Sequence, residues 1–188
     1  MVTQIERVKE VEEFSPQQPR LFSATHEEIL QGLTTDIYFV KTKEILGKLH
    51  KDDTEVVAEI FPRRSGIFAG LPEAKLLLGG LGLEVWSLPE GAPFEAKDVV
   101  MRIHGRYAKF GIYETAILGI LASSSGWASA ARVAKTAAEG RPVLCFGARH
   151  VHPAVAPVME RAAIVGGADG ASCILGAKLA GLEPSGTV

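Results

Sequence analysis

The segment that most constrains the fold runs from Pro142 to Pro153 and reads PVLCFGARHVHP. It opens with a short apolar run between glycine and proline, which is typical of a buried strand rather than a helix. Three potential cations, Arg149, His150 and His152, follow that run, and Pro153 favours a helix start after it. The carboxyl end of a strand, just before a helix, is where α/β folds place anion-binding chemistry. The same cations could equally be solvated loop residues, and this segment alone leaves both interpretations open.

Composition narrows the classes of partner. The chain has 188 residues, of which 47% are hydrophobic and 22% charged, and its formal net charge is -2. A dedicated nucleic-acid binder would be basic, so we expect no nucleic-acid partner, and local cations must hold any anionic ligand.

Residues 1–20 lack the apolar core of a signal peptide, and the stretch 116–131 is too short and polar to span a bilayer. We therefore expect no membrane segment and a cytoplasmic protein. Cys145 and Cys173 form no C-x-x-C pair, which indicates buried free thiols.

Residues 24–139 are expected to form a small α/β sandwich domain with a long helix, preceded by a charged leader over residues 1–23. Apolar periodicity and the placing of glycine and proline predict helices and antiparallel strands in this region. A short helix is expected over residues 5–14 of the leader. In residues 24–139, the expected strands cover residues 55–61, 83–88 and 98–105, and the expected helices cover residues 25–32, 36–49, 71–78 and 113–139. The last helix is rich in alanine, serine and glycine, so we expect other elements to pack closely on more than one of its sides.

The helix expected over residues 36–49 begins with two adjacent aromatic residues, Tyr38 and Phe39, after Thr35 or Asp36 as the N-cap. Adjacent residues on a helix point in different directions, so both cannot lie on its apolar stripe. One aromatic side chain must therefore point elsewhere, into a pocket or towards a neighbouring chain. The alternative is a half-exposed tyrosine at a helix start.

Residues 140–188 are expected to begin a parallel α/β arrangement. After the strand at 142–146, the pattern predicts a helix over 153–163, a strand over 164–172, a helix over 173–180 and a third strand from Pro184. Three such strands would leave an open apolar edge. We therefore expect either a truncated chain or another chain that completes the sheet.

Five segments stand in a fixed order along the chain: residues 35–39 (TDIYF), 105–119 (GRYAKFGIYETAILG), 146–153 (FGARHVHP), 166–170 (GGADG) and 186–187 (GT). Together they resemble nicotinate phosphoribosyltransferase, a type II phosphoribosyltransferase. The resemblance runs from about residue 25 to the last residue. It implies an α/β fold in which an N-terminal sandwich precedes an incomplete α/β barrel, of which this chain would hold the first three strands.

The resemblance implies a glycosyltransferase of NAD biosynthesis or salvage. Such an enzyme joins nicotinate to phosphoribosyl pyrophosphate, releases nicotinate mononucleotide and pyrophosphate, and couples this to ATP hydrolysis. The sugar passes through a cation-like state, as in glycoside cleavage. Mg²⁺ and cations must hold the leaving pyrophosphate, and a planar guanidinium suits the nicotinate carboxylate. Mg²⁺ and ATP are thus the implied cofactor and co-substrate, and we assign no metal ligand in this chain.

The same resemblance implies roles for residues of the C-terminal part. Arg149 would clamp the carboxylate or a phosphate, and His150 would assist at the phosphates, so both are candidate catalytic residues. Gly186 and Thr187 would line the base pocket where the third strand ends. These assignments make the end of the first strand the centre of the expected site.

In the N-terminal part, the resemblance implies that Tyr38 stacks on the pyridine ring of a substrate bound by the neighbouring subunit. Such stacking is worth about 1 kcal/mol. A homodimer with shared active sites is therefore expected. Asp36 would order the loop that carries Tyr38, and Glu114 would support the packing beneath the site.

Two alternatives remain open. Quinolinate phosphoribosyltransferase shares the fold, but in that family the first barrel strand ends in an Arg-Lys-Thr triplet, whereas this chain has Phe146, Gly147 and Ala148 before Arg149. The second alternative is not catalytic by itself. The chain would be a fragment, or one half of a split enzyme whose C-terminal polypeptide completes the barrel.

Overall fold

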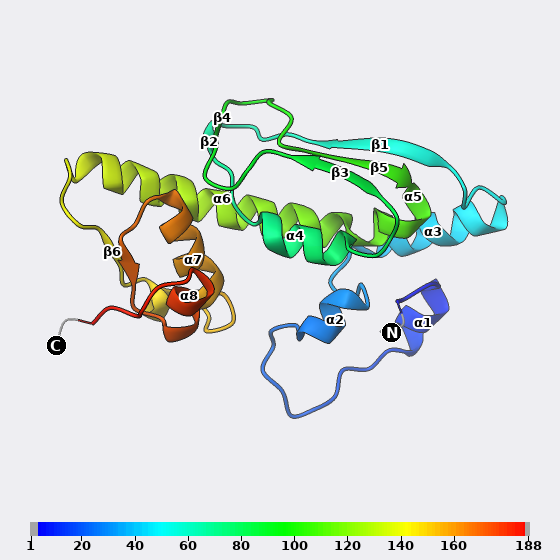
Figure 1. The fold of residues 1–188 in the computed structure, drawn as a ribbon. Coiled ribbons are helices and arrows are strands. Elements are labelled where there is room, and N and C mark those ends of the chain that lie inside the picture. The colour runs from blue at the N-terminus through cyan, green and yellow to red at the C-terminus, as the bar shows by residue number, and fades with distance from the viewer. Residues whose placement is uncertain (1–3, 187–188) are drawn as a thin grey trace. The chain divides into compact units, whose positions relative to one another are not determined.

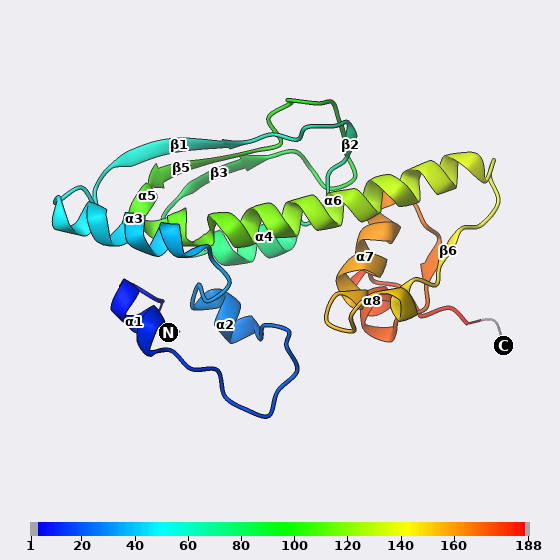
Figure 2. The same ribbon diagram turned by 180° about the vertical axis from the view of Figure 1, so that it is seen from behind.

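The computed structural model describes residues 4–186 (Figures 1 and 2). These residues divide into two compact units. The first unit comprises residues up to 58, 75–86 and 102–119, and the second comprises residues 59–74, 87–101 and those from 120 onwards. The units interleave along the chain, and the domain boundaries expected at residues 23 and 139 stay predictions. Within residues 4–186, every helix falls short of the length and apolar character that crossing a membrane requires.

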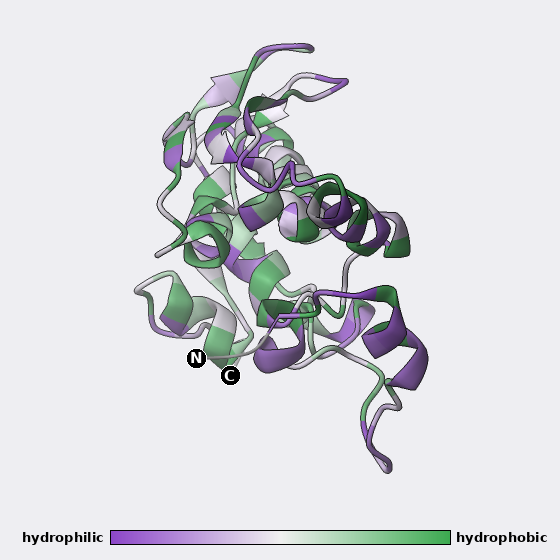
Figure 3. Ribbon diagram, turned by 90° about the vertical axis from the view of Figure 1, so that its right-hand side faces the viewer, coloured by the Kyte–Doolittle hydropathy of each residue, from purple (hydrophilic) through white to green (hydrophobic). Residues whose placement is uncertain are grey.

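The structure is mixed α/β, as the sequence predicts. The helices are α1 (Val8–Glu13), α2 (His26–Leu30), α3 (Ile37–Lys48), α4 (Leu71–Leu78), α5 (Tyr107–Phe110), α6 (Glu114–Ala137), α7 (Ala156–Gly166) and α8 (Ile174–Leu179), with 3₁₀ turns η1 (Gly111–Tyr113) and η2 (Ala148–His150). The strands are β1 (Glu55–Ile60), β2 (Gly66–Ile67), β3 (Glu84–Ser87), β4 (Pro93–Phe94), β5 (Met101–Arg106), β6 (Leu144–Cys145) and β7 (Gly170–Ala171). Green apolar and purple polar stretches alternate along the helices, as expected for elements with one buried face (Figure 3).

In the first unit, the leader is anchored on α3. The N–H of Val8 donates to the carboxylate of Glu44 (3.2 Å), and Lys43 pairs with Glu6 (2.8 Å). The helix α2 begins with a capping box, in which the Thr25 hydroxyl accepts from the N–H of Glu28 and the Glu28 carboxylate accepts from the N–H of Thr25. The short helices expected at residues 5–14 and 25–32 are therefore confirmed.

The strands β1, β5 and β3 form one sheet, with β5 in the centre. The N–H of Tyr107 donates to Thr54 at one end of the β1–β5 pair (3.0 Å), and the N–H of Val100 donates to Ile60 at the other (2.9 Å). This crossed register makes the pair antiparallel. Inward-facing residues of β5 are buried and alternate with exposed ones, so the sheet has the expected half-buried pattern.

In the second unit, the small residues of α6 receive two other segments. The side chains of Ser125 and Ser129 bond the backbone of Ala69 and Ile67 beside β2 (3.1 and 2.8 Å). Gly166 of α7 lies so close to α6 that a Cβ there would come within 2.1 Å of the Ala128 carbonyl oxygen. A larger residue at this contact would separate the two helices, which explains why the sequence uses small ones.

The C-terminal part is a β6–α7–β7 arrangement with parallel strands, in which Leu144 lies opposite Gly170. The strand expected over residues 164–172 is wrong in its first half, because α7 continues through Gly166 and β7 begins only at Gly170. The expectation that the first strand is buried is also wrong: Leu144 is 42% exposed. Within residues 4–186, β6 has only β7 as a hydrogen-bonded neighbour, which leaves its other edge uncovered.

Candidate functional site

The cations of the Pro142–Pro153 segment follow β6 directly. Gly147 is the N-cap of η2, and Arg149 and His150 are its last two residues. The N–H of His150 donates to the carbonyl of Gly147 (2.9 Å), which closes the turn. Both side chains are exposed at the carboxyl end of the strand. This position suits a ligand clamp, and it equally suits the solvated loop that the sequence left open.

The third potential cation of this segment has a local role. The Nδ1 atom of His152 accepts from the N–H of Ala154 (3.1 Å), in the turn that precedes α7. This hydrogen bond within the turn shapes the approach of the chain to the helix. The groups that remain available to a ligand at the end of β6 are therefore the Arg149 guanidinium and the His150 imidazole.

A buried carboxylate, Glu160 of α7, lies beneath this turn and has no exposed surface. One oxygen accepts from the N–H of Ala148 (3.2 Å) and from the hydroxyl of Ser172 (3.0 Å), and the other accepts from the N–H of Cys173. Sequence reasoning missed this residue. A signal was present, because Glu160 lies four residues after Ala156 and three before Ala163, on a helix face whose other members are apolar and buried.

The second strand of the predicted site ends beside the first. The N–H of Ser172, directly after β7, donates to the carbonyl of Cys145 (3.1 Å). On the opposite side of β7, the N–H of Ser185 donates to the carbonyl of Ala171 (2.8 Å), so the chain runs beside β7 at this point. The third strand expected from Pro184 is not formed over residues 184–186, the part of it that the structure describes. Gly186 follows and is exposed, and Thr187 lies outside the described residues.

The aspartate of the GGADG segment has a structural role at the amino end of β7. The Asp169 carboxylate accepts from Lys135 of α6 (2.6 Å) and from the N–H of Val143 (2.7 Å). The hydrogen bond from Lys135 holds the pKa of this carboxyl below its ordinary value, helped by the bond from Val143. Asp169 therefore connects the amino ends of β6 and β7 to α6. Its carboxylate lies at these amino ends and not at the carboxyl ends of the strands, where the site is expected.

The remaining predicted residues gather in the first unit, at the start of α3. Asp36 is the N-cap residue, but its carboxylate accepts from the Thr115 hydroxyl (3.1 Å), and that hydroxyl in turn accepts from the N–H of Asp36 (3.1 Å). Tyr38 is 55% exposed, whereas the adjacent Phe39 is buried. The two rings lie 4.2 Å apart between centroids. The prediction that only one of these aromatic side chains packs inside is confirmed.

Acidic groups surround the two phenols of this cluster. Burial raises the pKa of Tyr107 to about 12, and the nearby Glu114 carboxylate adds to the shift. Burial also raises the pKa of Glu114, against the opposing effect of the hydrogen bond from Tyr107 (3.5 Å). The pKa of Tyr38 is raised by desolvation and then by Asp36 and Glu114. Both phenols therefore stay protonated at neutral pH and can donate hydrogen bonds.

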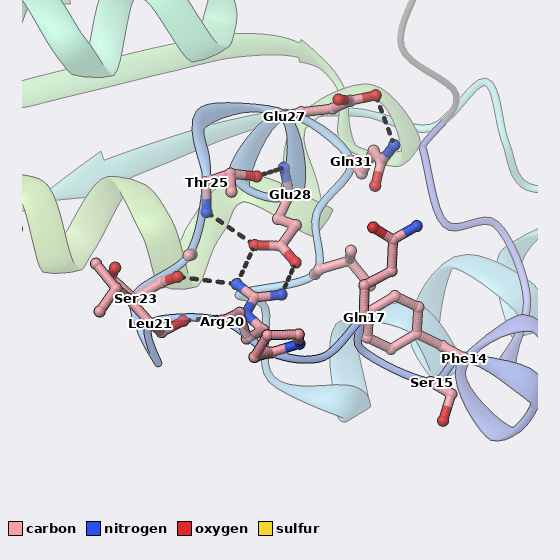
Figure 4. Close-up of a pocket in the computed structure, with 13 residues that line it drawn as sticks. Phe14, Ser15, Gln17, Arg20, Leu21, Ser23, Thr25, Glu27, Glu28 and Gln31 are labelled. Atoms are coloured by element: carbon pink, nitrogen blue, oxygen red, sulfur yellow. Dashed lines mark hydrogen bonds and ion pairs between the residues drawn. The ribbon is translucent and has the colours of Figure 1, made fainter.

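A separate hollow in the first unit is lined by the leader and α2, and none of the predicted site residues lines it (Figure 4). Arg20 forms an ion pair with both oxygens of Glu28 and also donates to the carbonyl of Ser23 (2.8 Å). The guanidinium is thus engaged by the chain itself. This hollow owes its shape to the folding of the leader against α2.

Known proteins share this fold and parts of this sequence. The family described as "Quinolinate phosphoribosyl transferase, N-terminal domain" matches residues 36–125. A nicotinate phosphoribosyltransferase of Mycobacterium tuberculosis is 32% identical over 106 residues, which are 56% of this chain and 23% of the relative. The crystal structure of nicotinate-nucleotide pyrophosphorylase from Pyrococcus furiosus is 43% identical, with a TM-score of 0.86 over 91% of this chain and 45% of that chain. The chain is thus similar to type II phosphoribosyltransferases over most of its length.

The family match is to an N-terminal domain, and the chain spans less than half the length of these two relatives. The crystal structure of human nicotinic acid phosphoribosyltransferase matches 82% of this chain and 39% of that chain, with a TM-score of 0.73. At 20% identity this match shows the fold alone. The recognised family and its mixed α/β architecture are therefore confirmed.

The predicted site residues fall into two groups. Asp36, Tyr38 and Glu114 lie in the first unit, and their mutual contacts are described above. Arg149, His150 and Gly186 lie in the second unit, after strands or extended segments that run beside β7. The roles assigned to these residues by resemblance stay predictions.

Proposed function

We propose that this chain belongs to a nicotinate phosphoribosyltransferase, which joins nicotinate to phosphoribosyl pyrophosphate and releases nicotinate mononucleotide and pyrophosphate. The observation that carries the proposal is the exposed pair Arg149 and His150 at the carboxyl end of β6, in a member of this family. The name of one relative supports the substrate class, since it is a nicotinate phosphoribosyltransferase.

In this proposal, Arg149 supplies a planar donor fork for a carboxylate or phosphate, and His150 adds a second donor next to it. Charge-assisted bonds of this kind are the strong ones in proteins. Tyr38 offers an exposed aromatic face for a pyridine ring, contributed to the site of a second subunit. Holding the pyrophosphate and the base on opposite sides of the sugar lowers the barrier chiefly by positioning and by electrostatic stabilisation.

The family also implies Mg²⁺ and ATP. Among residues 4–186, the structure contains no group of three or more His, Cys, Asp or Glu side chains that could hold a metal ion. Mg²⁺ in such sites is commonly bound through substrate phosphates and one or two carboxylates. We therefore assign no residue of this chain to Mg²⁺ or to ATP, and we keep ATP coupling, a shared-site homodimer and a cytoplasmic location as parts of the proposal.

Quinolinate phosphoribosyltransferase is the second candidate, because the matching family description carries that name. Quinolinate has two carboxylates, so its site needs more cationic donors than that of nicotinate. The turn after β6 offers Gly147 and Ala148 before Arg149, in place of a cationic triplet. We favour nicotinate for this reason.

The decisive experiment incubates the chain with nicotinate, phosphoribosyl pyrophosphate, ATP and Mg²⁺ and measures the mononucleotide, with quinolinate in parallel. Calorimetric titration of nicotinate and of phosphoribosyl pyrophosphate measures binding in the same preparation. We expect Arg149→Ala to weaken binding by about tenfold to a hundredfold, the worth of one charge-assisted hydrogen bond.

Arg141→Ala is the matched control, because Arg141 is exposed and precedes the same strand at its other end. It removes the same charge and should leave both affinities unchanged. Equal affinities in the Arg149 variant and the original chain would refute the clamp. Product from quinolinate and none from nicotinate would refute the substrate assignment.

A further inference from the structure

One buried residue of the second unit, Glu160, has no role assigned by the resemblance. Glu160 is fully buried, and the donors that reach it within residues 4–186 are two backbone N–H groups and one hydroxyl. A buried carboxylate is costly unless donors satisfy it. The three donors satisfy this carboxylate, and an apolar residue in its place would leave all three without an acceptor.

The three residues that donate to Glu160 are among the first residues after β6 and β7. Ala148 is the third residue after β6, and Ser172 and Cys173 are the first two after β7. The two strand ends also bond each other, through the N–H of Ser172 and the carbonyl of Cys145 (3.1 Å). Glu160 therefore bridges the two loops at the carboxyl edge of the sheet.

Neighbouring contacts show how tightly α7 is fitted under these loops. A Cβ at Gly147 would lie 2.6 Å from Cε of Met159, and a Cβ at Gly176 would lie 3.1 Å from Cβ of Glu160. Two consecutive residues of α7 thus support the turn that carries Arg149, and the second of them also supports the first turn of α8. Little room is left for either loop to shift.

We propose that Glu160 is a positioning residue: by bonding both strand-end loops, it fixes the turn that presents Arg149 and His150 to an anionic ligand. The proposal rests on the proposed function for the identity of that ligand, a pyrophosphate group. The carboxylate is needed because both of its oxygens accept, whereas the amide of glutamine has one acceptor and would place its NH₂ group against an N–H or hydroxyl donor.

The test compares Glu160→Gln with Glu90→Gln in the full chain. Glu90 is a matched control, because its carboxylate also accepts from two backbone N–H groups of the same unit, those of Gly70 and Leu71, which lie outside the strand ends. Amide hydrogen exchange of Ala148 and Cys173 is the first measurement. Because the single acceptor oxygen of glutamine can serve only one of these two sites, we expect exchange about tenfold faster or more at the other in Glu160→Gln, the effect of losing a hydrogen bond to a charged group, and unchanged rates in Glu90→Gln.

Calorimetric binding of inorganic pyrophosphate is the second measurement. We expect it to weaken by about tenfold in Glu160→Gln and to stay unchanged in Glu90→Gln, even where both variants lose similar stability. Affinity lost to the same degree in both variants would indicate general destabilisation and overturn the positioning role. Faster exchange with unchanged affinity in Glu160→Gln would overturn it as well.

The two measurements separate this proposal from the proposed function. If the original chain binds no pyrophosphate, the proposed ligand is wrong, while unchanged exchange at Ala148 and Cys173 would refute the bridge itself. Should Glu160→Gln not fold, Ser172→Ala replaces it, since it removes one donor and keeps both carboxylate oxygens. We then expect a smaller change in the same direction in both measurements, and no change in either would overturn the proposal.

Discussion

Replacing Glu90 with alanine should destabilise the protein more than replacing Arg161, although the two side chains form one ion pair. Arg161 donates to both oxygens of Glu90 (3.2 and 2.6 Å). The same carboxylate accepts from the N–H groups of Gly70 (2.7 Å) and Leu71 (3.2 Å), at the start of α4. Glu90 therefore accepts hydrogen bonds from three residues, whereas Arg161 donates its hydrogen bonds to this one carboxylate.

The structure sets the size of the difference. The two side chains are 18% and 26% exposed, so the pair lies between a surface ion pair and a fully buried one. Arg161→Ala leaves Glu90 with its two backbone donors, and we expect a loss of about 2 kcal/mol in the free energy of unfolding. Glu90→Ala leaves Arg161, Gly70 and Leu71 without their acceptor, and we expect a loss of about 4 kcal/mol.

Urea-induced unfolding at neutral pH measures both losses, and the expected difference corresponds to about 4–8 °C in Tm for a chain of this length. Burial acts to raise the pKa of Glu90, but the bonds from Arg161 and Gly70 outweigh it and hold the pKa below its ordinary value of 4.5. The stabilisation is therefore complete above that value and is lost as pH falls through the lowered pKa, so the variants should converge with the original chain in acid. Equal losses at neutral pH, or a larger loss for Arg161→Ala, would refute this reasoning.

Two further predictions concern the contact between α6 and α7 and the ion pair between Arg20 and Glu28. Gly166→Ala should cost about 1–3 kcal/mol or more, because its Cβ would meet the backbone oxygen of Ala128, whereas Gly126→Ala in α6, with nothing within 4 Å, should gain about 0.5–1 kcal/mol. Thermal unfolding that ranks them the other way would contradict the α6–α7 contact. The hydrogen bond from Arg20 lowers the pKa of Glu28 to about 2, helped by Thr25, so the amide chemical shift of Thr25 should titrate near that pH; a midpoint at the ordinary value of 4.5 would contradict the ion pair.

Elements whose ends are marked by local chemistry could be predicted closely from the sequence. The capping box at Thr25 fixes the start of α2. The predicted helix over 71–78 coincides with α4, and the one over 113–139 with α6 (Glu114–Ala137). In each case the signal lies within a few residues of the boundary, in caps, glycines or prolines, and tertiary contacts do not override it.

The strand predicted from Ile164 failed for the opposite reason. Ile164 and Val165 are β-branched and favour a strand by local preference. In the structure they continue α7, because Gly166 packs against α6, and Gly167, with a φ of 113°, ends the helix. A contact between residues 128 and 166 decides this boundary, and no pattern within a short window contains it.

The sequence predicts where the exposed residues of the candidate site lie, but it does not predict the buried residue that holds their turn in place. Arg149 and His150 follow an apolar run and precede a proline, so their position at a strand end is readable from the chain. The donors of Glu160 are two backbone N–H groups and a serine hydroxyl, located 12 or 13 residues away. Every residue except proline has a backbone N–H group, so residue types do not reveal which of these groups donates. The partners of this carboxylate can therefore be identified only from the fold.

Adjacent residues of α7 carry opposite charges that do not pair with each other. Glu160 bonds the loops after β6 and β7, and Arg161 bonds Glu90 beside the start of α4. Neighbours in a helix are rotated by about 100° from each other, so they face different surroundings. One turn of helix thus supports two unrelated parts of the second unit through separate contacts. A change at Glu90 should therefore reach the strand ends only through overall stability, and this separation is what makes Glu90 and Glu160 a fair comparison.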